Sequence, residues 1–368
     1  MPATRIVLFR PSLSDGGADR VTLTLLEKLD RARYAPTLVL VRREGAWIDR
    51  VPADVPVIDL HCRRLLLAVP ALARVLRAEA PDVVLCTAGG ANVIAVVAHR
   101  LARSRARLVL SERNAVRRPG FEWRNRLDVP LKRALYPLAD AVTAVSDGVA
   151  QDLREVLKLP PGQVRTVYNP VVGPELPALA AAPLDHPWFG DATRPVLVGV
   201  GRLVAQKDYP TMLQAFALLR ARCAVRLVIL GIGAEQAALE RLATELGIAD
   251  DVVFVGFDPN PFRWMARARL LVQSSLAEGL PGTLIQSMAC GTPVVATDCN
   301  YGPREVITTG VDGFLVAVGD ARALADRAYQ LVTDTALRER MSRAAAALAQ
   351  RYTLATSLRR YENAIDGR

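Results

Sequence analysis

Short apolar runs alternate with longer amphipathic stretches along the chain, and they form two series. The first series has runs at 6–9, 37–41, 83–86, 107–110 and 141–145, with a helical stretch at 18–29. The second has runs at 196–200, 226–230, 252–255, 270–273 and 294–296. Apolar runs that alternate with helical segments are typical of parallel strands covered by helices on both faces. The pattern predicts an α/β protein with two doubly wound parallel sheets.

A proline-rich segment at 170–195 separates the two series. Its six prolines are Pro170, Pro174, Pro177, Pro183, Pro187 and Pro195. Because proline cannot continue a helix or a central strand, we expect a linker here. The length of 368 residues suits two domains of ordinary size, which we place at 1–170 and 171–350.

Composition excludes several classes of protein. A hydrophobic content of 51% excludes a disordered chain. No apolar run reaches the roughly 18–20 residues that span a bilayer, and the N-terminus lacks a signal-peptide core, so we expect a cytoplasmic protein. The five cysteines lack CxxC spacing and the three histidines form no ligand cluster, so we expect reduced thiols and no metal.

The net charge of +10 belongs to the N-terminal half. Residues 1–170 carry 27 Lys and Arg against 17 Asp and Glu, whereas residues 171–368 carry 20 of each. A basic half suits an anionic membrane, an acidic substrate or nucleic acid, but no nucleic-acid recognition motif accompanies the charge. The densest segment, 117–133, holds five Arg and one Lys around Phe121 and Trp123. This composition predicts contact with an anionic membrane surface, and a solvated Arg-rich loop is the alternative.

Residues 278–297 place an acid beside an expected anion site. Pro281 and Gly282 mark the start of a helix and Gly291 marks its end, while Glu278 lies just before the start. Free amides at a helix N-terminus favour an anion. A ligand with both a diphosphate and sugar hydroxyls would suit the pair, although a crossover helix with a surface glutamate has the same pattern.

Polar residues and glycines follow most of the predicted strands, where ligands bind in open α/β sheets. Gly201, Arg202 and Lys207 follow the run at 196–200, and two cations around one loop can hold a diphosphate from two sides. Other strand ends carry Gly16 and Gly17, then Ser111, Glu112, Arg113 and Asn114, then Ser146, Gly231, Gly256 and Phe257. The glycines lack GxGxxG spacing, so no dinucleotide site is expected.

Taken together, these motifs resemble the retaining glycosyltransferases of family 4, which have the GT-B fold. The C-terminal segments are GRLVAQKDYP, LVILGIGAE, VVFVGF and SSLAEGLPGTLIQSMACGTPVVATDC, and GGADRV, SERN, AVSDGV and VYNPV fit the N-terminal half. The resemblance implies two Rossmann-like domains facing a cleft, the first binding the acceptor and the second the nucleotide-sugar donor. It also implies that the last segment, 351–368, is a helix that crosses back to the N-terminal domain.

The resemblance assigns donor-side roles residue by residue. Arg202 and Lys207 would hold the donor diphosphate and stabilise the leaving nucleotide without a metal. Glu278 would contact hydroxyls of the donor sugar. The other donor residues are Gly201, Gly231, Gly256, Phe257, Gly282, Thr283, Leu284 and Gln286, with Phe257 beside the base and the amides of 282–284 capping the diphosphate. Gln286 replaces the second acid of the family's E-x7-E motif, and its amide can still hydrogen-bond the ribose.

On the acceptor side the resemblance implicates Gly16, Gly17, Arg113, Asn114 and Ser146. Many relatives carry a histidine near the reacting sugar, and here the SERN stretch occupies a strand end instead. We expect Glu112 to orient the acceptor.

The expected reaction is transfer of a hexose or N-acetylhexosamine, with retention, from a UDP-sugar to a hydroxyl of the acceptor. The favoured acceptor is a polyprenyl-diphosphate-linked glycan, reached by a peripheral enzyme at the inner membrane face, with no cofactor. A soluble transferase acting on a small metabolite and a GT-B sugar-nucleotide epimerase remain alternatives.

Overall fold

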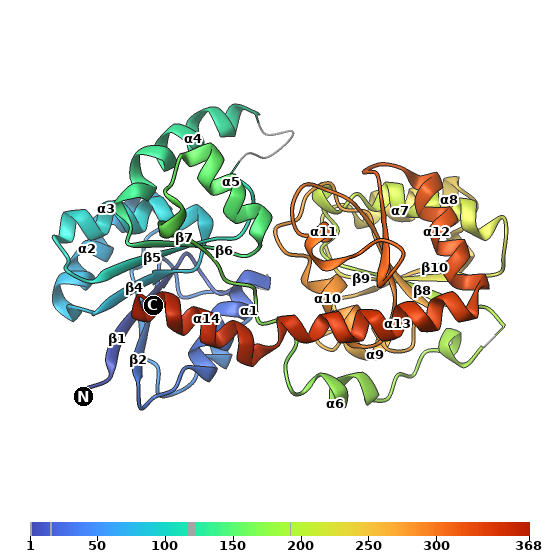
Figure 1. Cartoon of the computed structure of the whole chain (residues 1–368), viewed down its shortest axis with the longest axis horizontal. Coiled ribbons are helices and arrows are strands. Elements are labelled where there is room, and N and C mark those ends of the chain that lie inside the picture. The colour runs from blue at the N-terminus through green and yellow to red at the C-terminus, as the bar shows by residue number, and fades with distance from the viewer. Residues whose placement is uncertain (1, 15–16, 117–121, 192) are drawn as a thin grey trace. The chain divides into compact units, whose positions relative to one another are not determined.

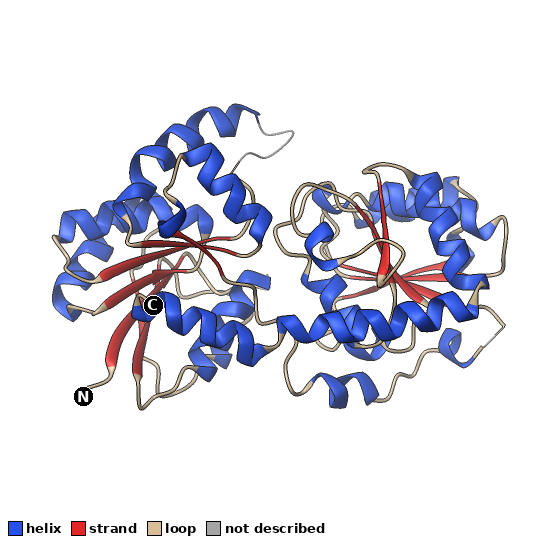
Figure 2. Ribbon diagram, in the orientation of Figure 1, coloured by secondary structure: helices blue, strands red, loops and turns tan. Residues whose placement is uncertain are grey.

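Two parallel sheets organise the chain, one in each of two compact units (Figures 1 and 2). Unit 1 comprises Met1–Pro170 and Ala355–Arg368, and unit 2 comprises Val171–Leu354. The computed structural model describes residues 2–14, 17–116, 122–191 and 193–368, except for the side chains of 18 and 122–125. Among the described helices, none is long and apolar enough to cross a bilayer.

The sheet of unit 1 has the strand order β3-β2-β1-β4-β5-β6-β7, with all pairs parallel. The strands are β1 (Thr4–Arg10), β2 (Tyr34–Leu40), β3 (Val57–Asp59), β4 (Val83–Cys86), β5 (Arg107–Glu112), β6 (Ala141–Ala144) and β7 (Val164–Thr166). The helices are α1 (Gly17–Lys28), α2 (Ala68–Glu79), α3 (Asn92–Ala102), α4 (Glu122–Leu135), α5 (Asp147–Leu157) and α14 (Leu354–Asp366).

The sheet of unit 2 has the order β10-β9-β8-β11-β12-β13, again all parallel. Its strands are β8 (Val196–Val200), β9 (Arg226–Leu230), β10 (Val252–Gly256), β11 (Leu270–Gln273), β12 (Val294–Thr297) and β13 (Gly313–Val316). Its helices are α6 (Leu176–Ala181), α7 (Tyr209–Arg220), α8 (Gln236–Glu245), α9 (Phe262–Met265), α10 (Gly282–Ala289), α11 (Pro303–Val306), α12 (Ala321–Thr333) and α13 (Thr335–Ala349).

Strand order reverses once in each sheet, between β1 and β4 in unit 1 and between β8 and β11 in unit 2. Such a reversal sends the connections of two neighbouring strands to opposite faces and leaves a crevice at their carboxyl ends, where ligands bind in this architecture. The loops after these four strands are therefore the places to look for chemistry.

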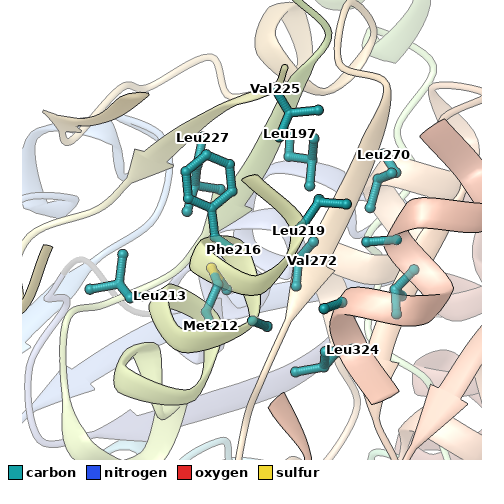
Figure 3. Packing of buried hydrophobic residues seen from close by; sticks show 14 of the residues in the cluster. Leu197, Met212, Leu213, Phe216, Leu219, Val225, Leu227, Leu270, Val272 and Leu324 are labelled. Atoms are coloured by element: carbon teal, nitrogen blue, oxygen red, sulfur yellow. The ribbon is translucent and has the colours of Figure 1, made fainter. Parts of the chain in front are cut away.

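Apolar side chains explain why each sheet is buried on both faces. In unit 2, Met212 and Phe216 of α7 and Leu324 of α12 pack on Leu197 and Val272 of the sheet (Figure 3). These side chains are almost fully removed from water. Burial of one such side chain contributes about 1.5–3 kcal/mol, so the interior of this layer is a main source of unit 2 stability.

The last helix, α14, belongs to unit 1 and not to the unit that precedes it. Its Tyr361 and Ile365 lie in the same apolar cluster as Leu8 of β1. Arg33 forms ion pairs of 2.9 Å with Glu362 and with Asp366 of the helix. Apolar burial and paired charges thus fasten the chain's end to unit 1.

The proline-rich segment 170–195 is not the free linker that its composition predicts. It forms α6 and a 3-10 helix, Pro187–Gly190, each with proline in its first turn, where a missing N–H is tolerated. Asn260 donates to the carbonyl of Leu179 at 2.9 Å, and the rings of Phe189 and Trp264 meet edge to face at 5.7 Å. From Val171 onward the segment is therefore a packed part of unit 2.

Candidate active site

An ion pair joins the loops that follow β8 and β11 in unit 2. Lys207 Nζ lies 2.5 Å from Glu278 Oε1, and the same oxygen accepts hydrogen bonds from Ser275 Oγ at 2.7 Å and Gln273 Nε2 at 3.1 Å. The two side chains are only 19% and 9% exposed. An acid beside an anion site would repel an anionic ligand. Here the negative charge of Glu278 is offset by Lys207 and by two hydrogen-bond donors, which reduces that repulsion.

The main chain holds both residues in place. Leu276 N donates to the carbonyl of Gln206 at 2.9 Å, and Gln206 Nε2 donates to the carbonyl of Ala277 at 2.7 Å. Ser274 Oγ also donates to the carbonyl of Lys207 at 2.8 Å. These hydrogen bonds connect the two loops at the point where the strand order reverses, and they fix the backbone positions of Lys207 and Glu278.

Arg202 is the second cation of this edge. Its side chain is exposed, and it makes no ion pair or side-chain hydrogen bond with any residue that the structure describes. The loop that carries it is anchored by Tyr209, whose hydroxyl donates to the carbonyl of Gly201 at 3.0 Å. Burial raises the pKa of Tyr209, so this hydroxyl stays protonated and keeps its donor role. The Arg202 side chain is thus available to a ligand, while the backbone of its loop is held in place by Tyr209.

Helix α10 begins and ends where the sequence predicts, at Gly282 and just before Gly291, whose φ of +78° suits glycine. The amide of Leu284, however, donates to the carbonyl of Pro281 at 3.1 Å and is already engaged in this structure, so its contact with a diphosphate stays a prediction. Within the described chain the amides of Gly282 and Thr283 have no acceptor. The free donors at this helix end are therefore two amides and not three.

Gly231, one of the four predicted donor glycines, lies where two loops touch. A Cβ on Gly231 would lie 1.9 Å from the carbonyl oxygen of Gly201, so this glycine lets the loops after β8 and β9 touch. Its amide donates to the carbonyl of Gly256 at 2.8 Å. The role of Gly231 is loop packing, which places Phe257 and Ile232 at the same edge. Phe257 is 56% exposed, and its ring offers a stacking surface for a base.

Gln286 faces the segment that enters unit 2. Its side-chain amide donates to the carbonyl of Val171 at 3.4 Å, and the residue is half-buried. A carbonyl acceptor on the same side chain remains suited to a hydroxyl partner.

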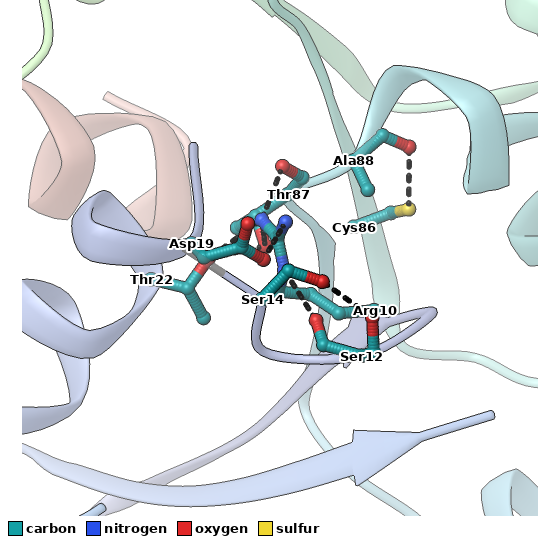
Figure 4. Close-up of polar contacts among 8 residues, drawn as sticks. All are labelled: Arg10, Ser12, Ser14, Asp19, Thr22, Cys86, Thr87 and Ala88. Atoms are coloured by element: carbon teal, nitrogen blue, oxygen red, sulfur yellow. Dashed lines mark hydrogen bonds and ion pairs between the residues drawn. The ribbon is translucent and has the colours of Figure 1, made fainter. Parts of the chain in front are cut away.

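Unit 1 also has a cation at the point where its strand order reverses. Arg10, the last residue of β1, is buried and donates to Thr22 Oγ1 and to the carbonyl of Thr87, each at 2.9 Å, and it pairs with Asp19 (Figure 4). Burial lowers the pKa of Arg10, Asp19 opposes this shift, and the positive charge of Arg113 adds to it. The network bridges β1 and β4 where the strand order reverses.

Arg113 lies close enough to Arg10 for their charges to repel, and it has donors to spare. Its Nη1 donates to Asn169 Oδ1 at 2.6 Å, whereas its Nε and Nη2 are buried without a partner among the described residues. A buried guanidinium donor without an acceptor costs folding free energy unless a ligand provides the acceptor. The two unpartnered nitrogens of Arg113 are thus suited to an anion at the carboxyl edge of the unit 1 sheet.

Glu112 does not face this edge. Its side chain is 1% exposed, and its Oε2 accepts from Lys132 Nζ at 2.9 Å and from the Tyr136 hydroxyl at 2.7 Å. Its Oε1 packs on Gly89, where a Cβ would lie 2.2 Å away. The expectation that Glu112 contacts an acceptor is thus not met in this structure. It pairs with Lys132 and ties α4 to the sheet.

The remaining acceptor-side predictions have mixed outcomes. Ser146 is buried and caps α5 by accepting from Val149 N at 3.2 Å, so it too is engaged inside the protein. Gly16 lies outside the described residues. Gly17 is exposed at the start of α1, and Asn114 is half-buried beside Arg113.

The basic segment 117–133 is only partly visible. Arg117, Arg118 and Phe121 lie outside the described residues, as do the side chains of Trp123 and Arg124. Lys132, which was expected on the basic surface, is buried against Glu112 instead.

Three side chains in these networks are not among the residues that the sequence pattern predicts: Arg10, Gln273 and Ser275. The signals were present. Arg10 is a charged residue that ends an otherwise apolar strand, and Gln273 and Ser275 belong to a polar run, Gln-Ser-Ser, between a buried strand and Glu278.

Both halves of the chain match known families. Residues 15–172 match Glycosyltransferase Family 4, and residues 187–348 match Glycosyl transferases group 1. One relative is the N-acetylgalactosamine-N,N'-diacetylbacillosaminyl-diphospho-undecaprenol 4-alpha-N-acetylgalactosaminyltransferase of Campylobacter jejuni, 28% identical over 91% of this chain and 92% of its own. Another is the lipopolysaccharide core biosynthesis glycosyltransferase LpsE of Rhizobium meliloti, 28% identical over 89% of each chain.

Solved structures agree on the fold. HepE of Anabaena, crystallised with UDP and glucose, superposes with a TM-score of 0.82 over 99% of this chain and 100% of its own, at 22% identity. Sucrose-phosphate synthase of Thermosynechococcus elongatus gives 0.78 over 98% of each chain at 20% identity. With its two parallel-sheet domains and a family match in each half, the chain is a glycosyltransferase with the GT-B fold and belongs to glycosyltransferase family 4.

Proposed function

We propose that this enzyme transfers a hexose or N-acetylhexosamine, with retention, from a UDP-sugar to a hydroxyl of a polyprenyl-diphosphate-linked glycan in bacterial surface-polysaccharide synthesis. One observation carries the donor half of the proposal. Lys207 pairs with Glu278 at the carboxyl edge of the unit 2 sheet, close to the start of α10 with its two free amides, and Arg202 lies on the same loop as Lys207. Cations and amides suit a diphosphate, and the acid suits sugar hydroxyls.

The chemistry follows from where charge develops. As the acceptor oxygen bonds to the anomeric carbon, the bond from that carbon to the donor phosphate oxygen breaks, and the leaving diphosphate takes the acceptor's proton. Lys207 and Arg202 neutralise the negative charge that builds up on the diphosphate. One such preorganised contact contributes about 3–4 kcal/mol to transition-state stabilisation. The displacement takes place on one face of the sugar and needs no protein nucleophile.

Glu278 keeps two hydrogen-bond donors even when Lys207 contacts the diphosphate. When a diphosphate draws Lys207 away, Ser275 and Gln273 still donate to Glu278 Oε1. The carboxylate therefore stays ordered and can accept hydrogen bonds from the donor sugar.

Arg113 supports a diphosphate-bearing acceptor. Its two unpartnered nitrogens and the nearby charge of Arg10 favour an anion in unit 1. The Campylobacter relative acts, by its name, on a diphospho-undecaprenol substrate. An acceptor of that chemistry would bring its own diphosphate to Arg113.

Exposed apolar side chains next to arginines support contact with a membrane. Leu66 is 76% exposed, its neighbour Leu67 is also exposed, and Arg63 and Arg64 precede them. On α4, Leu127 and Leu131 lie one turn apart and are exposed. Apolar side chains flanked by cations bind anionic lipid surfaces.

A transfer assay tests the proposal. The purified chain is incubated with radiolabelled UDP-glucose, UDP-galactose and their N-acetylated forms, with bacterial lipid extract as acceptor. We expect label in the organic phase and a product with the donor's anomeric configuration by NMR. Label that stays in a water-soluble product would indicate a transferase of small metabolites, and interconversion of the donor without an acceptor would indicate an epimerase.

A further inference from the structure

A cavity of about 340 Å³ lies at the amino ends of β8, β11 and β12, at the opposite edge of the unit 2 sheet from Lys207 and Glu278. Its wall includes Arg194, Arg269 and Pro293 just before these strands, and Arg338 of α13. Strand β11 has four residues, about 13 Å at 3.3 Å per residue, so the cavity is separated from the donor edge by the depth of the sheet.

Positive charge dominates the wall. Four arginines line the cavity, Arg194, Arg267, Arg269 and Arg338, against one carboxylate, Asp191. Asp191 is paired with Arg226 at 3.1 Å, and Arg194 is paired with Asp251. The charges of Arg267, Arg269 and Arg338 are left without an ion-pair partner in the described chain.

Arg269 and Arg338 are the central pair. Arg269 is half-buried, and its side chain makes no hydrogen bond with the described residues. With the residues that the structure describes, the Arg338 side chain makes two long bonds of 3.3 Å, to the carbonyl of Leu331 and to Thr335 Oγ1. Both guanidiniums belong to one cavity wall. Burial lowers the pKa of Arg338, and the positive charge of Arg269 lowers it further, against the opposing charges of Glu339 and Asp334.

We infer that this cavity is a second ligand site, which binds a phosphate-bearing anion between Arg269 and Arg338. Two planar guanidiniums with spare donors match phosphate oxygens, and the Ser342 hydroxyl in the same wall adds a further donor. The volume falls in the range of small-molecule sites and exceeds the needs of a single ion. The ligand is therefore a small phosphorylated molecule or the phosphate of a lipid headgroup.

This site is independent of the donor diphosphate. Ligands of doubly wound sheets bind at the carboxyl ends of the strands, and this cavity lies at the amino ends. An anion here would offset the positive charges of Arg338 on α13 and of Arg269 just before β11. Its binding would stabilise unit 2 whether or not the enzyme holds a donor.

Inorganic pyrophosphate is the probe for the free ligand. Because it also resembles the donor diphosphate and the diphosphate proposed for Arg113, binding is measured by calorimetry on the full chain carrying Arg113→Gln, Arg202→Ala and Lys207→Ala. We expect binding to persist in this background. Adding Arg269→Gln and Arg338→Gln should weaken it at least about tenfold, a loss of 1.4 kcal/mol. The matched control, Arg340→Gln, changes an exposed arginine on the same helix outside the cavity wall and should leave binding unchanged.

Cosedimentation with phosphatidylcholine vesicles, with and without phosphatidic acid, distinguishes the lipid source. If recruitment by phosphatidic acid falls in the Arg269→Gln, Arg338→Gln chain but not in the control, the ligand is a lipid phosphate. If only pyrophosphate binding falls, it is a soluble one. If neither changes relative to Arg340→Gln, the inference is overturned. Arg269→Gln alone serves if the double variant fails to fold, because the Arg269 side chain makes no hydrogen bond with the described residues and its backbone bond to Val196 is kept.

Discussion

Lys207 and Glu278 form a 2.5 Å ion pair although 71 residues separate them in the chain. The pair bridges the loops after β8 and β11, the two strands between which the sheet order reverses. Arg10 bridges β1 and β4 in the same way through Thr87. Each unit thus places a cation held by a carboxylate at its own switch point, where ligands of this architecture bind.

The Lys207–Glu278 pair should be energetically coupled. A double-mutant cycle with Lys207→Met and Glu278→Gln is expected to give a coupling energy of about 1–3 kcal/mol in urea unfolding, because both side chains are largely buried. Lys28→Met with Glu278→Gln is the matched control, since Lys28 is an exposed residue of unit 1, and it should show no coupling. Equal couplings in the two cycles would mean that the contact adds nothing specific.

Glu112 should act through folding and not through the acceptor. Lys132→Met alone leaves the buried carboxylate unpaired and should cost about 3–5 kcal/mol of unfolding free energy. Adding Glu112→Gln should recover a large part of this loss, because the unpaired charge is then gone. The double variant should retain transfer within about tenfold of the native kcat/KM. Loss of transfer in a folded double variant would restore Glu112 to a catalytic role.

Two glycines of the donor edge should differ in their tolerance of alanine. Gly231→Ala should lower stability by about 2–4 kcal/mol, since the new Cβ would collide with the carbonyl of Gly201 at a φ of +144°. Gly256→Ala should lower it by about 1–2 kcal/mol, because it has a φ of +81° but open space around the new Cβ. Thermal unfolding of the two variants measures the difference, and the reverse order would refute the assignment of Gly231 to loop packing.

Acid should destabilise unit 2 through His186. Burial, together with the charge of Arg226, lowers the pKa of His186 below its usual 6.5, and its Nδ1 accepts from Trp188 N at 3.3 Å. The unfolded chain therefore binds a proton more readily, so stability is full above pH 6.5 and falls as the pH drops through and below that value. His186→Asn keeps an acceptor but does not titrate. Its melting temperature should fall less between pH 7.5 and 5.5 than that of the native chain, and parallel curves would contradict the role of His186.

Most of the fold was predictable because its central strands are buried on both faces. The ten predicted strands are confirmed, and four of them, including β8 and β11, match to the residue. The three that the pattern misses, β3, β7 and β13, are all edge strands of three or four residues. An edge strand has one neighbour and less burial, so its sequence does not need a long apolar run.

The site was predictable by type of residue but not by partner. Arg202, Lys207 and Glu278 follow from loop position and resemblance. That Lys207 pairs with Glu278, and that Ser275 and Gln273 share the same oxygen, depends on how two loops meet in space. Glu112 and Ser146 show that a position at a strand end does not determine where a side chain points. Both stand at strand ends, yet each turns inward, one to pair with Lys132 and the other to cap α5.

The role of Lys207 at the donor diphosphate is tested by the binding of UDP to the native chain and to Lys207→Ala in isothermal titration calorimetry, with GDP, ADP and TDP as competitors. We expect UDP to bind best and Lys207→Ala to weaken its binding at least about tenfold, the loss of one charge-assisted contact to phosphate. Lys28→Ala should bind as the native chain does. Native-like affinity of Lys207→Ala for UDP, or a response confined to GDP, would contradict the assignment of this edge to a UDP-sugar diphosphate.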